Sequence, residues 1–557
     1  MTQKIHIRTV FLYVSIPIIF FFTIYHLLLL SIPQLHIPKL QYDAVSQLIQ
    51  IQPLNPIVPF PIQFTDNNSD HFPIANVSVL FPAWEVLVIV TESPENAHVA
   101  SNYTSRFCLF DTNEISPARF SGELPYDRKT YTCQLPKRFR RRLPFRQPVL
   151  TTCPDDHIIA QVSPAPEMLR WSYIVYNIIE TQSDVVLFVK GINNRQGVNR
   201  SPKEFKCLFG ENILNGVITS VSSSLQEVFR CERPHLTAFG QSPVKASLVI
   251  LQKNNNSVIV PSIAYYTPRR KIVEISKKKL LCACTMVFNV GKFLKEWVIY
   301  HSKIGVDRFI LYDNGSDDDL GEVVKLLRSR GYDIELRFWL WPKTQEAGFS
   351  HAALLAKNSC KWMMYIDVDE FVYSPSWKLL KPSKMLLGLL LPKFPYGELI
   401  IRCYEFGPSK QKKHPLLGVT QGYNCRNEVE NRHKSIVLLD AVHESLLNVI
   451  HHFKLKDGYK SMKVDIEKVV VNHYKYQVWD EFKAKFRRRV SAYVVDWTRS
   501  VNLKSNDRAP GLGSLAVKPD GWEERFCEVY DNRLRDLTRR WFGRQNGQLG
   551  FGMDWQY

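Results

Sequence analysis

The chain has 557 residues, which is enough for two or three domains with a core each. Its hydrophobic content of 45% and aromatic content of 12% exclude a generally disordered protein. The formal net charge of +19 first suggests nucleic-acid binding, but Lys and Arg are spread along the chain and no nucleic-acid motif accompanies them. We therefore expect no nucleic-acid partner, and attribute the charge to attraction for acidic or phosphorylated substrates and anionic surfaces.

The N-terminus predicts a membrane anchor. Residues 10–30 contain no Asp, Glu, Lys or Arg, and at about 1.5 Å per residue such a helix spans the roughly 30 Å hydrocarbon core. Lys4 and Arg8 precede the run and the next basic residue is Lys39, so residues 1–9 should stay cytosolic and the rest should be luminal. The alternative is a cleaved signal peptide, which the length of the run and the lack of a small-x-small cleavage site disfavour.

Two further patterns agree with a luminal body. N-glycosylation sequons occur in the N-terminal half at Asn67, Asn76, Asn102 and Asn255. The chain also has 11 cysteines, which predict disulfides in an oxidising compartment. Their pairing cannot be read from sequence, and the odd total leaves at least one thiol free or intermolecular.

Composition divides the region after the anchor into three parts. Residues 31–83 are rich in Pro and predict an extended luminal stem. Residues 84–265 consist of short β-type runs separated by turn residues, as expected for an all-β, sandwich-like accessory module. Residues 266–280 form a basic linker.

Beyond the linker, strand and helix patterns alternate, which predicts an α/β domain over residues 281–535 and a C-terminal tail over 536–557. The expected strands are residues 281–290, 308–316, 334–341 and 362–371, and the expected helices are 291–305, 320–331 and 344–360. Repeated β-α units indicate a Rossmann-like mixed sheet that is mainly parallel and binds ligands at the carboxyl ends of its strands.

Three carboxylates follow the apolar run of the last of these strands, in "WMMYIDVDEF". In extended chain, Asp367 and Asp369 point to the same side and can address one point. Converging carboxylates repel unless a cation lies between them, and oxygen ligands of this kind suit Mn²⁺ or Mg²⁺. The alternative is a solvated loop after a strand.

A second carboxylate cluster, "YDNGSDDD", ends the second expected strand. Asp313 could accept hydrogen bonds from a ribose or a base, as acidic residues do in dinucleotide folds. Asn314, Ser316 and Asp317 could also form an Asx-type turn with a helix N-cap, and both interpretations can hold together. Asn314 is formally a sequon, and we expect it to stay unmodified.

Together with "GKFLKEWVIYHSKIGVDRF", "HKSIV" and "VVNHYKYQVWDEF", these motifs resemble glycosyltransferase family 92. The similarity covers residues 278–535, and the "RAPGLGSLAVKPDGWEERFCEVYD" segment is similar to the plant branch, which includes galactan β-1,4-galactosyltransferases. The resemblance implies a GT-A fold, a UDP-sugar donor, Mn²⁺ and inversion at the anomeric carbon. Plant galactan synthases also carry a carbohydrate-binding-like β module, similar in position to residues 84–265.

Carried over residue by residue, the resemblance implies that Asp367 and Asp369 bind the metal. It implies nucleotide and donor binding by Asn289, Glu296 and Trp297 of the first strand-helix motif, by Asp313, Asn314 and Ser316 of the YDN-x-S turn, and by Lys434 of the KSIV motif. A late histidine is the third protein ligand of the metal in many GT-A enzymes, and the candidates are His451 and His473.

The catalytic base and the acceptor are left open. An inverting transfer needs a base within hydrogen-bond reach of the acceptor hydroxyl. Four carboxylates are candidates, and none stands out: Glu405, Glu428, Glu430 and Asp480. After its aromatic-x-Phe-Gly core, the "CYEFGPSKQKKHP" segment departs from the galactan synthases, which leaves the acceptor and the donor sugar uncertain.

The sequence thus predicts a Golgi type II membrane glycosyltransferase with a luminal catalytic domain. It would transfer a sugar, galactose by the resemblance, from a UDP-sugar to a glycan such as a cell-wall polysaccharide. The alternative is an inactive, membrane-tethered glycan-binding protein, against which the presence of both Asp367 and Asp369 argues. A nucleotidylyltransferase is disfavoured by the anchor, and a homo-oligomer is left open.

Overall fold

The structure is a computed structural model, which describes residues 75–91, 105–111, 114–141, 143–152, 165–193, 199–235, 243–252, 256–268, 277–377, 386, 394–486, 518–546 and 550–557. All of them belong to one compact unit, His71–Tyr557. Within these ranges no helix is long and apolar enough to cross a membrane. The predicted anchor, residues 10–30, lies outside the described residues.

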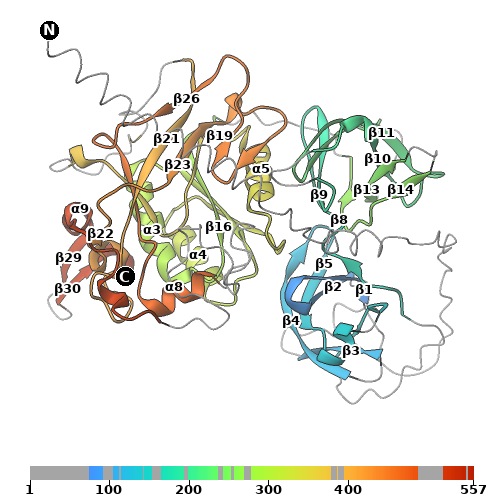
Figure 1. The fold of residues 1–557 in the computed structure, drawn as a ribbon, viewed down its shortest axis with the longest axis horizontal. Coiled ribbons are helices and arrows are strands. Elements are labelled where there is room, and N and C mark those ends of the chain that lie inside the picture. The colour runs from blue at the N-terminus through green and yellow to red at the C-terminus, as the bar shows by residue number, and fades with distance from the viewer. Residues whose placement is uncertain are drawn as a thin grey trace, which may run out of the picture. The chain divides into compact units, whose positions relative to one another are not determined.

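The α/β domain is built on a nine-stranded mixed sheet in the order β18-β17-β16-β19-β23-β21-β27-β20, with β26 also paired to β21 (Figure 1). Its strands are β16 (Lys279–Val287), β17 (Arg308–Asp313), β18 (Ile334–Phe338), β19 (Cys360–Tyr365), β20 (Glu370–Tyr373), β21 (Tyr396–Glu405), β23 (His433–Leu438), β26 (Lys460–Lys463) and β27 (Val470–His473). The first four strands of this order are mutually parallel and β23 runs against β19. The predicted Rossmann-like mixed sheet is confirmed.

Helices cover both faces of this sheet. The principal helices are α3 (Gly291–Ile304), α4 (Leu320–Ser329), α5 (Gln345–Ala356), α8 (Trp479–Phe486) and α9 (Arg533–Phe542), and α7 (Val419–Gly422) is a single turn. Apolar residues of α3 and α4 share one core with Ile436 of β23, whereas those of α5 share another core with Val437. Because neighbouring strand residues point to opposite faces, α5 lies on the other side of the sheet from α3 and α4. The first three helices agree with prediction, and α3 ends at Gly305, whose φ of 124° favours glycine.

The β-rich region is all-β, as expected, but it differs from a single sandwich-like module because each of its two sheets has a core of its own. The first sheet contains β1 (Ala75–Leu80), β2 (Glu85–Thr91), β3 (Arg106–Phe110), β4 (Glu114–Leu124), β5 (Arg128–Gln134), β6 (Val149–Thr151) and β7 (Leu169–Arg170). The second contains β8 (Ile174–Glu180), β9 (Asp184–Lys190), β10 (Phe205–Phe209), β11 (Val217–Leu225), β12 (Val228–Glu232), β13 (Val244–Leu251), β14 (Ser257–Ile259) and β15 (Tyr265–Tyr266).

Each β sheet has a core of its own and a second buried face. In β2, Val86 and Val88 enter the core of the first sheet, while Leu87 and Ile89 enter the core that also contains α5. The strand β9 divides its side chains in the same way between the core of the second sheet and the α5 core. Continuous apolar runs, unlike alternating ones, are what a strand buried on both faces requires.

The C-terminal residues 536–557, expected to be a tail, are part of the α/β domain. They complete α9 and form the hairpin β29 (Gly543–Asn546) and β30 (Gly550–Met553), followed by the short helix η12 (Asp554–Gln556). Phe542 and Trp555 enter the domain core, and the indole of Trp555 donates to Leu417 O at 3.0 Å. Removal of this segment would therefore expose core surface.

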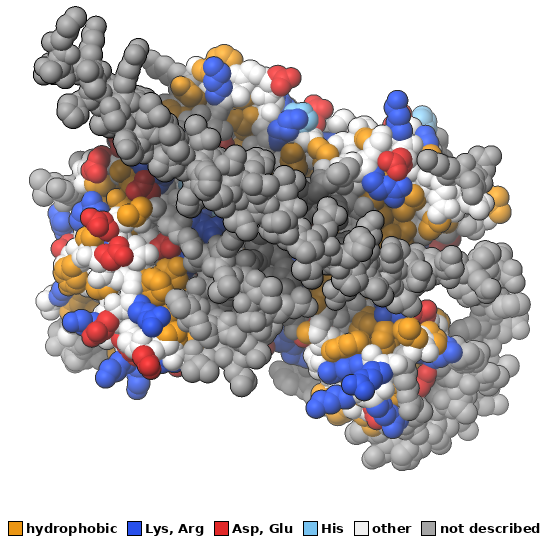
Figure 2. Space-filling view, viewed as in Figure 1, with side chains coloured by type: hydrophobic (Ala, Val, Ile, Leu, Met, Phe, Trp, Pro, Cys, Tyr) orange, Lys and Arg blue, Asp and Glu red, His pale blue; other side chains and the backbone are white. Residues whose placement is uncertain are grey.

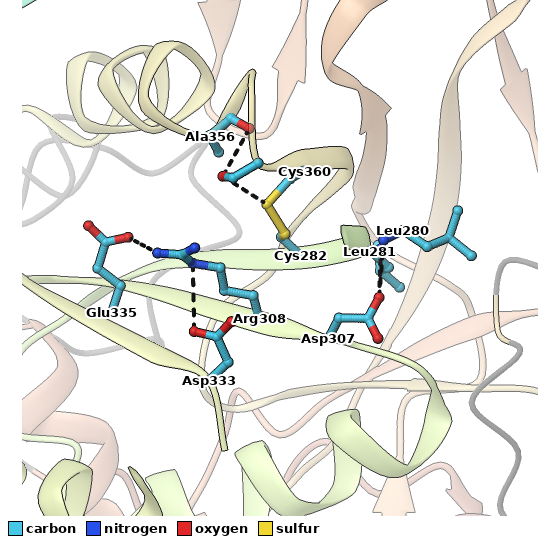
Figure 3. The surroundings of a disulfide bond; sticks show 10 residues. Leu280, Leu281, Cys282, Asp307, Arg308, Asp333, Glu335, Ala356 and Cys360 are labelled. Carbon is cyan, nitrogen blue, oxygen red and sulfur yellow. Dashed lines mark hydrogen bonds and ion pairs between the residues drawn. A yellow bond between two sulfur atoms is a disulfide. The ribbon is translucent and has the colours of Figure 1, made fainter. Parts of the chain in front are cut away.

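The predicted disulfides are present, and the structure gives their pairing. The four bonds are Cys108–Cys133, Cys207–Cys231, Cys282–Cys360 and Cys425–Cys527. Figure 3 shows Cys282–Cys360, which joins the adjacent strands β16 and β19 beside the ion pairs of Arg308. Cys284 and Cys403 are buried free thiols, and Cys153 lies outside the described residues.

Candidate active site

The Asp367–Glu370 turn lies at the carboxyl end of β19, at the edge where a parallel sheet binds ligands, and it connects β19 to β20. Glu370, to which the sequence pattern gave no role of its own, fixes this turn: its Oε2 accepts a hydrogen bond from Asp367 N at 2.9 Å. Its side chain is fully buried, whereas the Asp367 and Asp369 side chains are 33% and 15% exposed. The two aspartates therefore remain accessible to a ligand.

His473 reaches this turn from β27. It is the register partner of Glu370 across the antiparallel pair β20–β27. Its Nε2 lies 3.5 Å from Asp369 Oδ2, and its Nδ1 lies 3.5 Å from Glu370 Oε1. The structure thus brings together a strand-end carboxylate and a histidine that are separated by more than a hundred residues of sequence.

Lys434 enters the carboxylate cluster from β23. Its Nζ lies 3.0 Å from Asp367 Oδ2, 2.7 Å from Glu370 Oε1 and 2.6 Å from His451 Nε2. Burial alone would lower the pKa of Lys434, but Asp367 and Glu370 outweigh it and raise that pKa above its usual value. Lys434 is therefore a permanently charged counter-ion inside the cluster.

His451 is placed differently from His473. Its Nε2 accepts a hydrogen bond from Lys434 and lies 3.9 Å from Asp367 Oδ2. Burial, followed by the charge of Lys434, holds the pKa of His451 well below its usual value, so the imidazole is neutral. Because its Nε2 lone pair is already used by Lys434, His451 is a poorer metal ligand than His473 in this arrangement.

The chemistry of the cluster fits a divalent cation, although its present geometry is not that of a closed metal site. Within the described ranges, no three His, Cys, Asp or Glu side chains lie close enough together to hold a metal ion as they are. However, Asp367, Asp369 and His473 offer two carboxylates and an imidazole, a donor set that suits Mn²⁺. The Nδ1 of His473 is also buried without a hydrogen-bond partner.

The second carboxylate cluster forms a tight turn at the end of β17. Asp313 Oδ1 accepts hydrogen bonds from Ser316 N at 2.9 Å and from Ser316 Oγ at 2.7 Å. Burial raises the pKa of Asp313, while these hydrogen bonds oppose the shift. The turn is thus closed by Asp313, and the N-cap of α4 is Asp319, whose side chain makes no capping hydrogen bond, so the turn and N-cap expected of Asn314, Ser316 and Asp317 are not formed as predicted. Nucleotide binding by Asp313 and Ser316 stays a prediction.

Asn289 and Asn314 hold the loops beside this turn. The Oδ1 of Asn289, a residue with a left-handed φ of 51°, accepts from Asp317 N at 2.8 Å, which joins the loop after β16 to the loop after β17. Asn314 is buried, and its Nδ2 donates to Trp339 O at 2.7 Å. Both residues therefore contribute to the shape of the loops from which a nucleotide would be bound.

The Glu-Trp pair of α3 has internal partners. Glu296 is buried and accepts hydrogen bonds from Val419 N at 2.7 Å, Thr420 N at 3.0 Å and Thr420 Oγ1 at 2.6 Å. Burial raises the pKa of Glu296 to about 7. Trp297 donates its indole N–H to Glu370 O at 3.1 Å and thereby supports the Asp367–Glu370 turn. Glu296 thereby fixes the α7 turn, and its predicted role in nucleotide binding stays a prediction.

The four candidate bases have different surroundings. Glu405 is the register partner of His473 across β21–β27, but it is buried and accepts from Lys475 Nζ at 2.7 Å. Glu430 pairs with Arg402, while Glu428 is exposed and Asp480 lies on the exposed side of α8 beside Lys483. Of the four, only Glu405 adjoins the cluster.

Comparison with known proteins defines the class. The chain matches glycosyltransferase family 92 over residues 277–504. It is 36% identical over 504 residues to a glycosyltransferase family 92 protein of Ricinus communis, an alignment that covers 86% of each chain. The protein therefore belongs to glycosyltransferase family 92.

Two further similarities are weaker, one because it covers a small part of the chain and the other because its identity and TM-score are low. A galactan beta-1,4-galactosyltransferase of Arabidopsis thaliana is 30% identical over 115 residues, which covers 17% of this chain and 21% of that protein. Among solved structures, the mannosyltransferase of Pyrobaculum calidifontis in complex with GDP-Man and Mn²⁺ is 10% identical with a TM-score of 0.22, covering 41% of this chain and 70% of that one. A structural likeness at this level carries no argument.

Proposed function

We propose that this protein is a Golgi type II membrane enzyme that transfers a sugar from a UDP-sugar to a glycan acceptor, with inversion and with the help of a divalent metal. The observation that carries the proposal is the cluster at the end of β19, where Asp367 and Asp369 meet Lys434 and His473. Carboxylates at this edge of an α/β sheet can bind a metal ion, and the nearby buried cation, Lys434, can attract a diphosphate.

Asp367, Asp369 and His473 would hold the Mn²⁺ or Mg²⁺. When bound, such a cation would neutralise charge on the departing diphosphate. The chain itself supplies the support: Lys434 holds Asp367, and Trp297 fixes the turn through Glu370 O. Because these supporting groups are buried and hydrogen-bonded, the backbone of the turn is held in place, and the side chains of Asp367, Asp369 and His473 would converge on the cation by rotating about their own bonds.

Galactose is the proposed donor sugar. It is supported by the motif resemblance and by the partial similarity to a galactan beta-1,4-galactosyltransferase. The Golgi membrane location is supported by the charge-free run of residues 10–30 and by the flanking charges. A sensitive test of topology is protease protection in microsomes, where a protected C-terminus supports the proposal and a digested one contradicts it.

The activity test uses the detergent-solubilised full chain and measures UDP release from UDP-galactose, UDP-glucose and UDP-N-acetylglucosamine, in Mn²⁺ and in EDTA. We expect UDP-galactose to be hydrolysed fastest and only in Mn²⁺. A clear preference for another sugar would overturn the donor alone, and equal release in EDTA would overturn metal dependence. If no UDP-sugar is turned over although the protein binds glycans, the inactive glycan-binding alternative holds.

A further inference from the structure

The most basic segment of the chain forms a surface that shares no residue with the cluster at the end of β19. It folds as the short 3-10 helix η5 (Lys137–Arg141) beside the first β sheet. We name its four cations, Lys137, Arg138, Arg140 and Arg141, the basic ridge. In the part of the molecule that Figure 1 labels β1 to β5, Figure 2 shows Lys and Arg side chains gathered next to an apolar patch.

The ridge carries excess charge. Arg138 pairs with Glu114. Within the described part of the chain, no carboxylate forms an ion pair with Lys137, Arg140 or Arg141, and neither Lys137 nor Arg141 is shielded from solvent. Three positive charges within five residues repel each other, so an anionic ligand at this surface would relieve a repulsion that the carboxylates of the described residues do not neutralise.

Aromatic rings hold the guanidinium groups in place. The guanidinium carbon of Arg140 lies 5.7 Å from the centre of the Trp84 ring, and that of Arg138 lies 5.2 Å from the Phe139 ring. The Trp84 ring also packs edge to face against the Phe145 ring, with 6.0 Å between the two ring centres. Stacked guanidinium groups lose less side-chain freedom when they bind a ligand, because part of that freedom is already lost.

The backbone under Trp84 is strained in a way that keeps this ring at the surface. Ala83 and Trp84 have φ values of 60° and 64°, two consecutive non-glycine residues in the left-handed region, which L-residues with a side chain seldom adopt. Trp84 O accepts from Leu135 N at 2.8 Å, which fastens the ring next to η5, and its side chain stays 36% exposed. Strain that places an aromatic ring beside unpaired cations points to binding.

We propose that the basic ridge binds a carboxylate-bearing glycan chain, a polyuronate. Three of its four cations are arginines, and a planar guanidinium matches a carboxylate through two parallel hydrogen bonds, whereas a lysine offers only a point charge. A contact with an anionic membrane would use the exposed Trp84 and the cations as point charges, and it would not need planar guanidinium groups, so the three arginines favour a carboxylate polymer. The choice of a glycan among polycarboxylates rests on the proposed function.

The test measures binding of the detergent-solubilised full chain to immobilised polygalacturonate, with fully methyl-esterified polygalacturonate as the matched neutral polymer. We expect binding to the acid form only, and a loss of affinity as salt screens the charges. Equal binding to both polymers would overturn the proposal. Because no donor is added, a failure here is distinct from a failure of the transferase activity.

Variants locate the site. K137Q/R140Q/R141Q should bind at least tenfold more weakly, whereas K303Q/K325Q/K460Q, which removes three exposed charges elsewhere, should stay within twofold of the parent. R138K/R140K/R141K retains the charge but loses the planar groups and should lose several-fold affinity. Melting temperatures of all three variants check that they fold.

Two competitor ligands decide the class of partner. Poly-glutamate and phosphatidylserine vesicles present negative charge without sugar rings. Weaker binding of both, compared with polygalacturonate at equal charge concentration, supports a polyuronate. If poly-glutamate binds equally well, or if the vesicles bind better and K137Q/R140Q/R141Q abolishes that binding, the proposal is overturned in favour of plain charge attraction or a membrane contact.

Discussion

The ammonium of Lys434 lies 3.0 Å from Asp367 Oδ2, so the cation that faces the predicted metal ligand belongs to the protein itself. The same nitrogen lies 2.7 Å from the fully buried Glu370. Lys434 therefore offsets part of the repulsion among three carboxylates before any ligand arrives. It also explains how such a cluster can sit at the end of a buried strand in a folded protein.

The first prediction concerns this pair. Lys434→Met should lower the free energy of unfolding by about 3 kcal/mol, because it leaves Glu370 and Asp367 facing each other without a counter-charge. Urea denaturation measures the loss, and Lys460→Met on the exposed strand β26 is the matched control. Adding Glu370→Gln to the Lys434→Met variant should recover part of the stability. A Lys434→Met variant as stable as the parent would show that the buried charge needs no partner.

The second prediction uses Glu296, whose burial raises its pKa from 4.5 to about 7. Between these values the native state keeps a proton that the unfolded chain has lost, so the free energy of unfolding should fall as pH rises from about 4.5 to about 7 and then level off. At ~1.4 kcal/mol per pKa unit the group contributes about 3 kcal/mol to this fall.

Glu296→Gln checks this assignment because a glutamine does not titrate. Denaturation curves at pH 5, 6, 7 and 8 should show a shallower pH dependence for Glu296→Gln than for the parent, while Glu322→Gln, on the exposed face of α4, should keep the parental slope. The Glu296→Gln variant is also expected to be less stable than the parent at low pH, because the NH₂ of the glutamine amide would face the N–H of Val419. An unchanged slope would rule out Glu296 as the titrating group.

The third prediction concerns the sequon at Asn314. Its side chain is 3% exposed and its Nδ2, the atom to which a glycan would be attached, donates to Trp339 O. Glycopeptide mapping of protein from a plant or animal secretory host should find glycans among Asn67, Asn76, Asn102 and Asn255 and none at Asn314. A glycan on Asn314 in folded protein would contradict the packing of the β17 turn.

Local patterns in the sequence were sufficient to predict the order of the β-α units and the position of the Asp367–Glu370 turn. Apolar periodicity and strand-end carboxylates are properties of short segments, so they can be recognised without knowledge of long-range contacts. Long-range contacts were not predictable in the same way. The hydrogen bond between Lys434 and His451 joins two chain segments that come together only in the folded protein. The disulfide pairing and the docking of Trp555 into the core depend on such meetings too.

The sequence contains a pattern that indicates two separate cores in the β-rich region, although composition alone did not reveal it. Runs such as residues 86–90 and 185–189 are apolar at every position, not at every second position. Such runs indicate strands buried on both faces, and a single two-layer sandwich exposes one face of each sheet. Both runs belong to strands with two buried faces, one in each sheet.

The last prediction tests the site itself. Asp369→Asn keeps the volume of the side chain and the backbone contact from Tyr474 N to Asp369 O at 2.9 Å, so the fold should persist, with a melting temperature close to that of the parent. Transfer should be lost, because the variant removes one of two carboxylates available to a divalent cation next to His473. Titration calorimetry gives a readout that does not depend on turnover: Mn²⁺ should strengthen UDP binding to the parent and have little effect on Asp369→Asn. Asp457→Asn, an exposed carboxylate in the turn before β26, is the matched control and should behave like the parent. If Asp369→Asn retains activity within twofold, or if Mn²⁺ strengthens its UDP binding as much as in the parent, Asp369 is not a metal ligand.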